Sequence, residues 1–198
     1  IVKALFKSWF IDFDPVKAKS EGLSTGLADE ISDLFPDSFE DSKLGQLPKD
    51  WHIYKLGDVI SIKYGKNFPT KNLQKSGYPV FGGNGIIGYH SNFLYEEQMT
   101  LMSCRGAASG GILRSLPMSF ITNNSLVMDH LSTGFPSQRY LELFLQSRDR
   151  SGFVTGSAQP QVTIESIYDF LFLVPNFDLL KYFQKLIEPL NLSVNNEN

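Results

Sequence analysis

The glycine- and asparagine-rich stretch from Tyr78 to Asp129 constrains the fold of this chain more than any other feature. It consists of short runs that are typical of β-strands, and glycine, asparagine or small polar residues separate each run from the next. Because glycine tolerates positive φ angles, this punctuation predicts tight turns between short strands. We therefore expect a compact β framework that offers backbone and small polar groups to a partner, with the rest of the chain supporting it.

Length and composition allow one ordinary domain, or one domain with appendages. The chain has 198 residues, of which 42% are hydrophobic, and a single cysteine, so no disulfide can form within it. No apolar run approaches the roughly 18–20 residues of a membrane span, and the start does not resemble a signal peptide. These observations predict a cytoplasmic protein without membrane contact. Because the sequence begins inside a helical pattern and lacks an initial methionine, we interpret it as part of a longer protein.

The distribution of charge argues for nucleic acid although the net charge of −3 argues against it. Residues 55–115 contain seven basic and three acidic residues, whereas residues 1–50 contain six and ten and residues 116–198 contain five and eight. Basic charge is thus concentrated in or beside the glycine- and asparagine-rich stretch, where a phosphate-facing surface requires it. A chance excess of lysine on a solvated loop is the alternative, and this distribution alone does not choose between them.

The first fifty residues predict a helix followed by a connector. Apolar residues at helical spacing predict a helix over Ile1–Phe13, ended by Asp14 and Pro15 because the residue before proline avoids the α region. Residues 16–49 are acidic and weakly periodic, and we expect an extended connector with one helical turn at most. Trp51 then starts the compact domain.

The remaining elements have clear local signals. Leu56–Ile62 predicts a short helix that runs into an extended segment, and Pro136 with Ser137 opens a helix over residues 137–150. Thr163 is placed to cap a short helix that ends at Tyr168. The predicted elements after it are a buried strand over Phe170–Val174 and a helix over Leu179–Leu190 whose apolar residues have coiled-coil-like spacing, with a kink near Pro189.

Several motifs of catalysis or cofactor binding fail on context. Gly83, Gly85 and Gly88 match the G-x-G-x-x-G pattern, but no helix pattern or well-spaced acidic residue follows, so a glycine-rich turn is the better interpretation. Cys104 could act as a thiol nucleophile with His90 or His130, but a plain buried cysteine fits its strand-like run better. The histidines and the cysteine lack metal-ligand spacing. We expect no catalytic residue, no metal and no cofactor in this chain.

A polar recognition set remains in the same region. Lysines can contact phosphates, arginines can read guanine edges or clamp phosphate, and asparagine or glutamine can read adenine. Aromatic side chains and histidine can pack on the sugar or the backbone. The candidate DNA-binding residues are Lys63, Tyr64, Lys66, Lys71, Asn84, Tyr89, His90, Arg105, Ser109, Arg114, Asn123, Asn124 and Gln159.

Four segments together carry a resemblance to a known family. They are Ala4–Gly22, Leu47–Lys66, the glycine-asparagine motif Tyr78–Tyr89 with the small residues after Arg105, and the SAQPQ-containing segment Gly156–Ile167. On these segments the chain resembles the DNA sequence-specificity subunit of Type I restriction-modification systems, over nearly its whole length.

The resemblance implies an α+β fold, with a compact, β-rich target recognition domain over residues 47–176. It implies that residues 1–46 are the end of a central conserved helix with its connector, and that residues 177–198 start a second conserved helix; both are expected to be coiled-coil-like. In this family, such a domain reads one half of a split site in double-stranded DNA. The helices dock modification subunits and, through them, restriction subunits. Methylation and cleavage, with S-adenosylmethionine, belong to those partners.

The end helices supply the expected subunit-interface residues and the main alternative function. Those residues are Leu5, Trp9, Leu179, Phe183, Leu186 and Leu190. In the alternative, the chain is a helix-mediated interaction or assembly module that can self-associate, and the basic loop is incidental. A small hydrolase that uses Cys104 is a third hypothesis.

Overall fold

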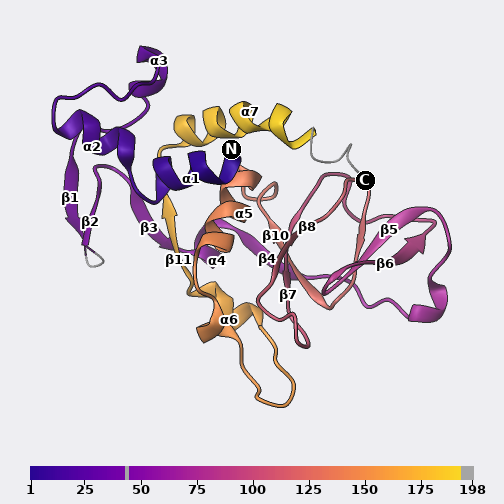
Figure 1. Cartoon of the computed structure of the whole chain (residues 1–198). Helices are drawn as coiled ribbons and strands as arrows, with labels where there is room; N and C mark the ends of the chain where they lie inside the picture. The colour runs from indigo at the N-terminus through magenta and orange to yellow at the C-terminus, as the bar shows by residue number, and fades with distance from the viewer. Residues whose placement is uncertain (43–44, 193–198) are drawn as a thin grey trace. The chain divides into compact units, whose positions relative to one another are not determined.

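The computed structural model describes residues 1–42 and 45–192, with side chains described up to residue 189. The described chain divides into two compact units (Figure 1). The end unit combines Ile1–Ile53 with the segment from Leu173 onward, and the central unit is Tyr54–Phe172. Strands β3 (His52–Lys55) and β11 (Leu171–Val174) pair as a two-stranded sheet.

Helices and one hairpin build the end unit. Its helices are α1 (Val2–Phe10), α2 (Asp14–Ser20), α3 (Asp29–Ser32) and α7 (Phe177–Leu192). Strands β1 (Phe39–Ser42) and β2 (Gly45–Pro48) form an antiparallel pair. The Asn176 side-chain oxygen accepts the Leu179 amide at 2.8 Å, and its side-chain nitrogen donates to the Leu34 carbonyl at 2.8 Å. One side chain thus caps α7 and ties it to the segment after α3.

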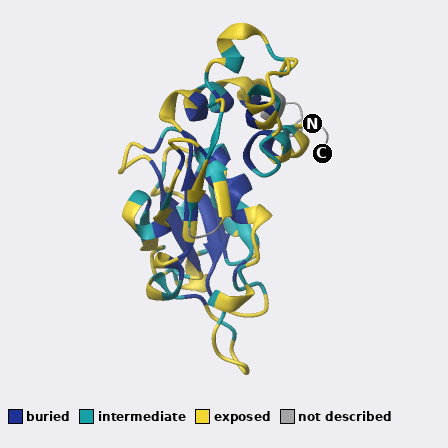
Figure 2. Cartoon of the chain, turned by 90° about the vertical axis from the view of Figure 1, so that its left-hand side faces the viewer, coloured by how far each residue is buried: buried dark blue, intermediate teal, exposed yellow. Residues whose placement is uncertain are grey.

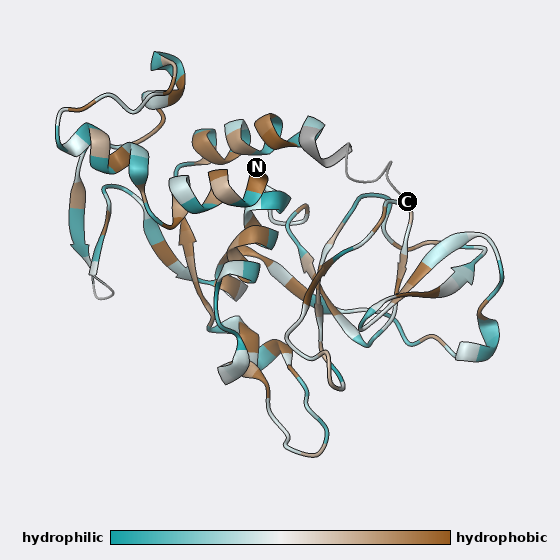
Figure 3. Cartoon of the chain, viewed as in Figure 1, coloured by the Kyte–Doolittle hydropathy of each residue, from teal (hydrophilic) through white to brown (hydrophobic). Residues whose placement is uncertain are grey.

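An aromatic core joins α1 to α7. The Phe183 ring lies 5.0 Å from the Phe10 ring, edge to face, and 6.0 Å from the Trp9 ring. Trp9 also meets Phe35 edge to face at 5.1 Å, and Phe10 lies 5.9 Å from Trp51. Such pairs add stability beyond the apolar area that they bury. Hydrophobic and hydrophilic segments alternate along α7 as it turns (Figure 3), which is the pattern of a helix with one buried face.

The structure corrects the predicted path of the end unit. Helix α1 ends at Phe10, and Phe13 adopts a left-handed φ of 58° before α2. Pro15 lies in the first turn of α2, where its missing N–H costs nothing, so it starts a helix as well as following one. Residues 16–49 are not an extended connector, because they contain most of α2, α3 and the β1–β2 hairpin. Helix α7 continues through Pro189 to Leu192.

A four-stranded antiparallel sheet forms the middle of the central unit. Its strand order is β4 (Ser61–Tyr64), β10 (Ser125–Asp129), β7 (Thr100–Ser103) and β8 (Ile112–Arg114). Every residue of β7 and β10 is buried, because these two strands lie in the interior of the sheet. Figure 2 shows these buried strands in dark blue against largely exposed loops.

A glycine-rich hairpin forms a second, three-stranded sheet. Strand β5 (Tyr78–Gly82) pairs with β6 (Gly85–His90) in antiparallel and with β9 (Phe120–Ile121) in parallel. Gly83 and Asn84 make the turn, and Gly85 has a φ of 109°. The glycine pattern therefore forms a tight β-turn followed by a strand, as the sequence analysis favoured, and not a dinucleotide-binding turn, which requires a helix. Phe81 of β5 and Ile121 of β9 pack with Met99, Leu101 and Val127 in one buried cluster.

Short helices complete the central unit largely as predicted. They are α4 (Leu56–Val59), the 3₁₀ turn η1 (Thr70–Asn72), α5 (Gln138–Ser147), the 3₁₀ turn η2 (Ser151–Phe153) and α6 (Ile164–Tyr168). The Ser137 hydroxyl accepts the Tyr140 amide at 3.1 Å, and Thr163 forms a reciprocal capping box with Ser166. The predicted cap at Thr163 and the predicted helix start at Ser137 are thus confirmed. The mixed, β-rich α+β class is confirmed as well.

Candidate nucleic-acid interface

One end of the four-stranded sheet gathers loops that are far apart in the sequence. At this end β4 and β7 finish and β8 and β10 begin, because neighbouring strands are antiparallel. Ser103, the last residue of β7, pairs with Ser125, the first residue of β10. The segments that leave or enter the sheet there carry much of the predicted recognition set. We use the name loop cluster for eight residues at this end: Lys66, Gly83, Asn84, Arg105, Asn123, Asn124, Pro160 and Gln161.

Backbone hydrogen bonds hold the loop cluster together. The Lys66 amide donates to the Ile121 carbonyl at 2.9 Å, and the Lys66 carbonyl accepts the Asn123 amide at 3.0 Å. The Asn124 carbonyl accepts the Cys104 amide at 3.0 Å. Main-chain hydrogen bonds thus fix the loops that contain Lys66 and Asn124, so the side chains of these loops are not needed to hold them in place.

Arg105 joins the cluster through the loop that contains the SAQPQ residues. Arg105 and Gln161 form an isolated antiparallel bridge. Next to it, the Gly106 amide donates to the Pro160 carbonyl at 2.9 Å, and the Cys104 carbonyl accepts the Val162 amide at 3.1 Å. Two motifs that lie some fifty residues apart in the sequence therefore become neighbouring backbone segments.

The hairpin tip fits against this surface because residue 83 is glycine. A Cβ atom at Gly83 would lie 2.9 Å from the Ser103 Oγ and 3.2 Å from the Asn124 carbonyl oxygen. In addition, the Ser125 hydroxyl donates to the Gly82 carbonyl at 3.0 Å. The turn is therefore held on the end of the sheet, with Asn84 beside it and exposed to solvent.

The cluster presents polar side chains that have no partner among the residues that the structure describes. Lys66, Asn84, Arg105 and Asn124 are exposed, and in the described part of the chain their side chains make no hydrogen bond or ion pair. Amide groups and a guanidinium fork in this state can hydrogen-bond base edges, and an ammonium group can neutralise phosphate. The arrangement therefore combines base-reading and phosphate-binding chemistry on a rigid β scaffold.

Asn123 of the cluster and two predicted residues that flank it, Ser109 and Gln159, are placed differently. Ser109 is half-buried, and its hydroxyl donates to the Pro160 carbonyl at 2.8 Å. Asn123 is half-buried, and its carbonyl accepts the Cys104 thiol at 3.4 Å. Gln159 is exposed in the loop before Pro160.

Lys63 and Arg114 lie on the two outer strands of the sheet and are engaged in ion pairs. The Lys63 ammonium is 2.8 Å from Asp129. The Arg114 guanidinium is 3.6 Å from the carboxylate of Glu142 in α5. The Arg139 guanidinium forms a second ion pair with that carboxylate, at 2.6 Å. Arg114 pairs with Thr100, at the opposite end of the sheet from Arg105. The sequence predicts the same DNA-binding role for Arg105 and Arg114, but the structure places them at opposite ends of the sheet.

These ion pairs shift the pKa values of their members. The hydrogen bond from Lys63 to Asp129 raises the pKa of Lys63. Burial works to raise the pKa of Asp129, but the hydrogen bonds from Lys63 and Ser132 outweigh it, so that its pKa is lowered. Burial lowers the pKa of Arg114 while Glu142 works against that shift. All these side chains stay charged near neutral pH.

Four other predicted residues lie outside the loop cluster, although Tyr64 ends β4 next to it. Tyr64 ends β4, Lys71 lies in η1 and Tyr89 lies in β6, and all three are exposed. His90 is half-buried with its ring 5.1 Å from the Phe68 ring and 5.8 Å from the Phe120 ring. Its Nδ1 atom also accepts the Asn92 amide at 3.2 Å, so His90 packs as part of the scaffold.

Cys104 is poorly suited to catalysis. It is 1% exposed, and burial raises the pKa of its thiol, which disfavours the nucleophilic thiolate. Among the described residues, no group of three or more His, Cys, Asp or Glu side chains is arranged to hold a metal ion. The described helices include none that is both long and apolar enough to cross a membrane.

The predicted subunit-interface residues fall into three groups. Trp9, Leu179 and Phe183 are buried within the end unit, where Trp9 and Phe183 pack against each other. Leu5 is half-buried and Leu186 is 38% exposed. Leu190 lies outside the residues whose side chains are described. The buried face of α7 uses Leu180 and Ile187 rather than Leu186.

Sequence reasoning missed two residues near the cluster. Gln161 is exposed and bridged to Arg105, and the second glutamine of SAQPQ was the signal available for it. Arg150 is half-buried and donates to three backbone carbonyls. Nothing in its local sequence distinguishes it from a surface arginine.

Comparison with known proteins identifies the family. A sequence model described as the Type I restriction modification DNA specificity domain matches residues 48–188. The chain is 23% identical over 211 residues to the specificity subunit of the Type I restriction enzyme MjaIX of Methanocaldococcus jannaschii, covering 96% of this chain and 45% of that protein. It is 21% identical over 145 residues to the EcoprrI specificity subunit of Escherichia coli, covering 71% and 36%. The chain thus spans less than half the length of these curated relatives.

Solved structures share the fold. The S subunit of a Type I restriction-modification system from M. genitalium matches with a TM-score of 0.63 and 12% identity, over 74% of this chain and 40% of that one. A chain from a structural study of complex assembly in the type I R-M system matches with a TM-score of 0.58 and 14% identity, over 98% and 48%. Because the family model covers well over half of the sequence, this chain belongs to the Type I restriction modification DNA specificity domain family.

Proposed function

We propose that this chain is the part of a Type I specificity subunit that reads one half of a bipartite site in double-stranded DNA. In this proposal residues 47–176 form the target recognition domain, and residues 1–46 and 177–198 belong to the flanking conserved regions. The chain carries no catalytic residue of its own and requires no cofactor. Methylation and cleavage are carried out by partner subunits.

One observation carries the proposal. Lys66, Asn84, Arg105 and Asn124 come from four separate segments to one end of the sheet, where they are exposed and lack partners in the described chain. By contrast, the side chains of Lys63 and Ser109 donate hydrogen bonds within the protein, and Arg114 is ion-paired with Glu142. A set of unpaired amide and cationic groups on a fixed scaffold is what base readout requires.

The electrostatics divide the roles within this set. Arg105 and Asn84 are the proposed base readers, because their planar groups can make bidentate contacts to guanine and adenine. Lys66 and Lys71 are exposed and are proposed to contact phosphates, with Tyr64, Tyr89, Asn123 and Gln159 as flanking contacts. Ser109 and His90 are better explained as supports, because their polar atoms are bonded within the protein.

The end unit is proposed to dock the modification subunits and, through them, the restriction subunits. Leu186 is 38% exposed on α7 and Leu5 is half-buried on α1, so these two predicted interface residues remain accessible to a partner. Trp9, Leu179 and Phe183 support this surface from inside, because they are buried. Self-association through the same helices is the alternative use of this surface.

Two measurements on the chain with its modification subunit test the proposal. Mapping methylated sites in a genome that carries the intact system yields the half-site. Titration then compares duplexes that contain this half-site with duplexes in which its bases are exchanged. We expect salt-dependent binding, with a slope of roughly 0.9 per phosphate contact, and about 10³-fold or greater preference for the half-site. Equal affinity for both duplexes would sink the proposal and favour an assembly module.

A further inference from the structure

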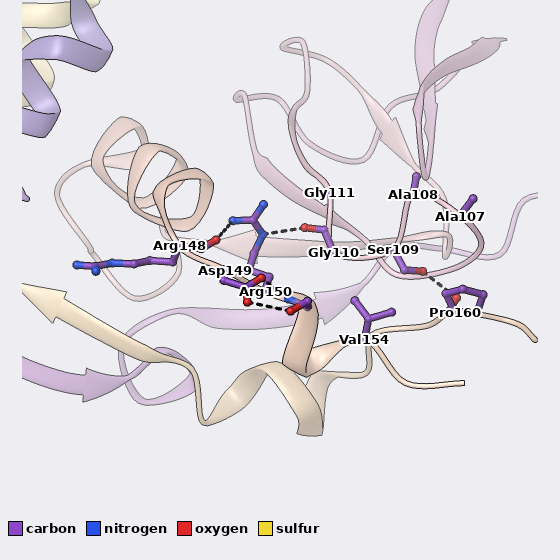
Figure 4. A pocket seen from close by; sticks show the side chains of 11 residues that line it. Ala107, Ala108, Ser109, Gly110, Gly111, Arg148, Asp149, Arg150, Val154 and Pro160 are labelled. Carbon is purple, nitrogen blue, oxygen red and sulfur yellow. Dashed lines mark hydrogen bonds between the residues drawn. The ribbon is translucent and has the colours of Figure 1, made fainter. Parts of the chain in front are cut away.

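The turn that follows Arg105 is built only from small residues. We call Gly106, Ala107, Ala108, Ser109, Gly110 and Gly111 the small-residue turn. An open pocket of about 570 Å³ lies against it and is also lined by residues 148–151, Val154 and Pro160 (Figure 4). Because these side chains bury little apolar surface, packing alone cannot fix the turn. Its conformation must depend on hydrogen bonds.

Besides backbone hydrogen bonds within the turn and to Ser103, two further contacts hold the turn beside the pocket. On one side the Pro160 carbonyl accepts both the Gly106 amide at 2.9 Å and the Ser109 hydroxyl at 2.8 Å. On the other side the Gly110 carbonyl accepts the Arg150 Nε–H at 2.8 Å (Figure 4). Gly106 and Gly110 both have positive φ angles, of 79° and 84°, which glycine adopts readily and other residues adopt rarely.

Arg150 links the turn to the end of α5. Besides Gly110, its guanidinium donates to the carbonyls of Leu145 and of Arg148, the latter at 2.6 Å. The Leu145 carbonyl lies in the last turn of α5, where it also accepts the Arg148 amide at 3.4 Å, and Arg148 is the residue just after the helix. Burial lowers the pKa of Arg150 and Asp149 works against that shift, but a guanidinium stays charged in proteins. A single charged group therefore satisfies carbonyls from two elements.

We propose that Arg150 is a positioning residue for DNA recognition. It fixes the small-residue turn and thereby the direction in which the adjacent Arg105 side chain is presented, without contacting DNA itself. This inference rests on the proposed function. The geometry favours arginine, because its Nε and Nη1 atoms reach carbonyls in different directions, whereas the three donors of a lysine ammonium radiate from one nitrogen.

The test compares Arg150 with the neighbouring Arg148. Arg148 is exposed, its guanidinium lies over the Phe144 ring at 5.0 Å, and its side chain makes no hydrogen bond to the turn. Arg150→Met and Arg148→Met remove the same charge from the same loop. The readout is the ratio of Kd values for a duplex with the half-site and a duplex with one exchanged base, measured on the chain with its modification subunit.

We expect Arg150→Met to reduce this ratio about tenfold, since it removes charge-assisted hydrogen bonds, while Arg148→Met changes it less than about twofold. Arg150→Lys should give an intermediate ratio. A purely structural role would weaken binding to both duplexes equally and leave the ratio unchanged. An unchanged ratio in Arg150→Met overturns the inference while the wild-type preference keeps the proposed function intact; absence of wild-type preference overturns both.

Hydrogen exchange supplies a measurement that does not involve DNA. In Arg150→Lys, the amides of residues 107–111 should exchange faster than in the wild type, while the amides in the middle of α5 keep their protection. This comparison decides the matter if Arg150→Met does not fold. Unchanged exchange at the small-residue turn would contradict the proposal.

Discussion

The end unit and the central unit use their side chains in opposite ways. The end unit contains eight basic and thirteen acidic residues, and its large side chains face one another in an aromatic core around Phe183. The central unit contains ten basic and eight acidic residues, and at one end of its sheet it exposes amide, guanidinium and ammonium groups that have no partner among the described residues. In the end unit, the large side chains pack against one another within the protein. In the central unit, a ligand can supply the hydrogen-bond and charge partners that the exposed polar groups lack among the described residues.

This difference shows where binding should reside. Apolar side chains gain stability from burial in proportion to area and need no external partner. Polar groups that stay solvated and rigidly placed contribute little to stability, so their arrangement is free to serve recognition. Substitutions in the end unit should therefore affect folding, whereas substitutions in the loop cluster should affect DNA preference. The following predictions test this division.

The largest effect is expected from the aromatic core. Phe183→Ala removes a fully buried ring that contacts Phe10 and Trp9, and should lower the free energy of unfolding by about 3–5 kcal/mol. Leu186→Ala, one turn along α7 and 38% exposed, should change it by less than about 0.5 kcal/mol. Urea unfolding measures both. Equal losses would show that the exposed face of α7 is packed too.

The two arginines of the recognition set should separate next. Arg105→Ala should cost about 1–3 kcal/mol of discrimination against an exchanged base and leave unfolding nearly unchanged. Arg114→Ala breaks the ion pair with Glu142, so it should destabilise the fold by about 1–3 kcal/mol while base discrimination stays as in the wild type. Paired titrations and melting curves check this. A loss of discrimination in Arg114→Ala alone would reverse the assignment.

Position 83, where the hairpin tip contacts the end of the sheet, should tolerate no side chain. Gly83→Ala places a Cβ 2.9 Å from the Ser103 Oγ, and the required shift should cost about 1–3 kcal/mol of stability and move Asn84. Gly152→Ala is the control, because nothing lies within 4 Å of a Cβ there. Thermal unfolding and DNA titration of the two variants give the comparison. A Gly83→Ala protein that matches the control would mean that the tip is not held on the sheet.

A smaller effect, on the salt dependence of DNA affinity, should distinguish Lys66 from the nearby Lys63. Lys66 is exposed and unpaired in the described chain, whereas Lys63 is held by Asp129 at 2.8 Å. Lys66→Ala should lower affinity for all duplexes alike and reduce the salt slope by about 1, since one phosphate contact is lost. Lys63→Ala should change the slope less. Affinities measured over a series of salt concentrations distinguish them, and a larger change for Lys63→Ala would be the contrary result.

The smallest effect concerns acid stability. The pKa of Asp129 is lowered in the folded state, so its contribution is present above the unfolded value of about 3.9 and is lost as the pH falls through the folded value. Asp129→Asn should therefore be less stable than the wild type at pH 7, by about 1 kcal/mol or less, and the gap should close below about pH 4. Urea midpoints at several pH values test this. A gap that persists in acid would show that the charge of Asp129 is not its source.

Local signals explain why several elements could be predicted from the sequence. Ser137 and Thr163 accept amide hydrogens within three residues, so their capping roles depend only on nearby chain. The glycine turn at Gly83 was recognised for the same reason. The path of residues 16–49 was predicted wrongly, because the buried contacts of Val16 and Phe35 override a weak local pattern.

The sequence by itself determined the strand runs, the turns, the helix caps and the family, because each depends on residues that are close in the chain or on recognisable motifs. The tertiary structure alone decided which polar residues remain unpaired. Arg105 and Arg114 are the same residue type in similar local sequence. In the structure Arg105 lies beside the hairpin tip and is bridged to Gln161, whereas Arg114 is ion-paired with Glu142 of α5. The partner of a charged side chain is set by long-range strand order and register, which no local pattern contains.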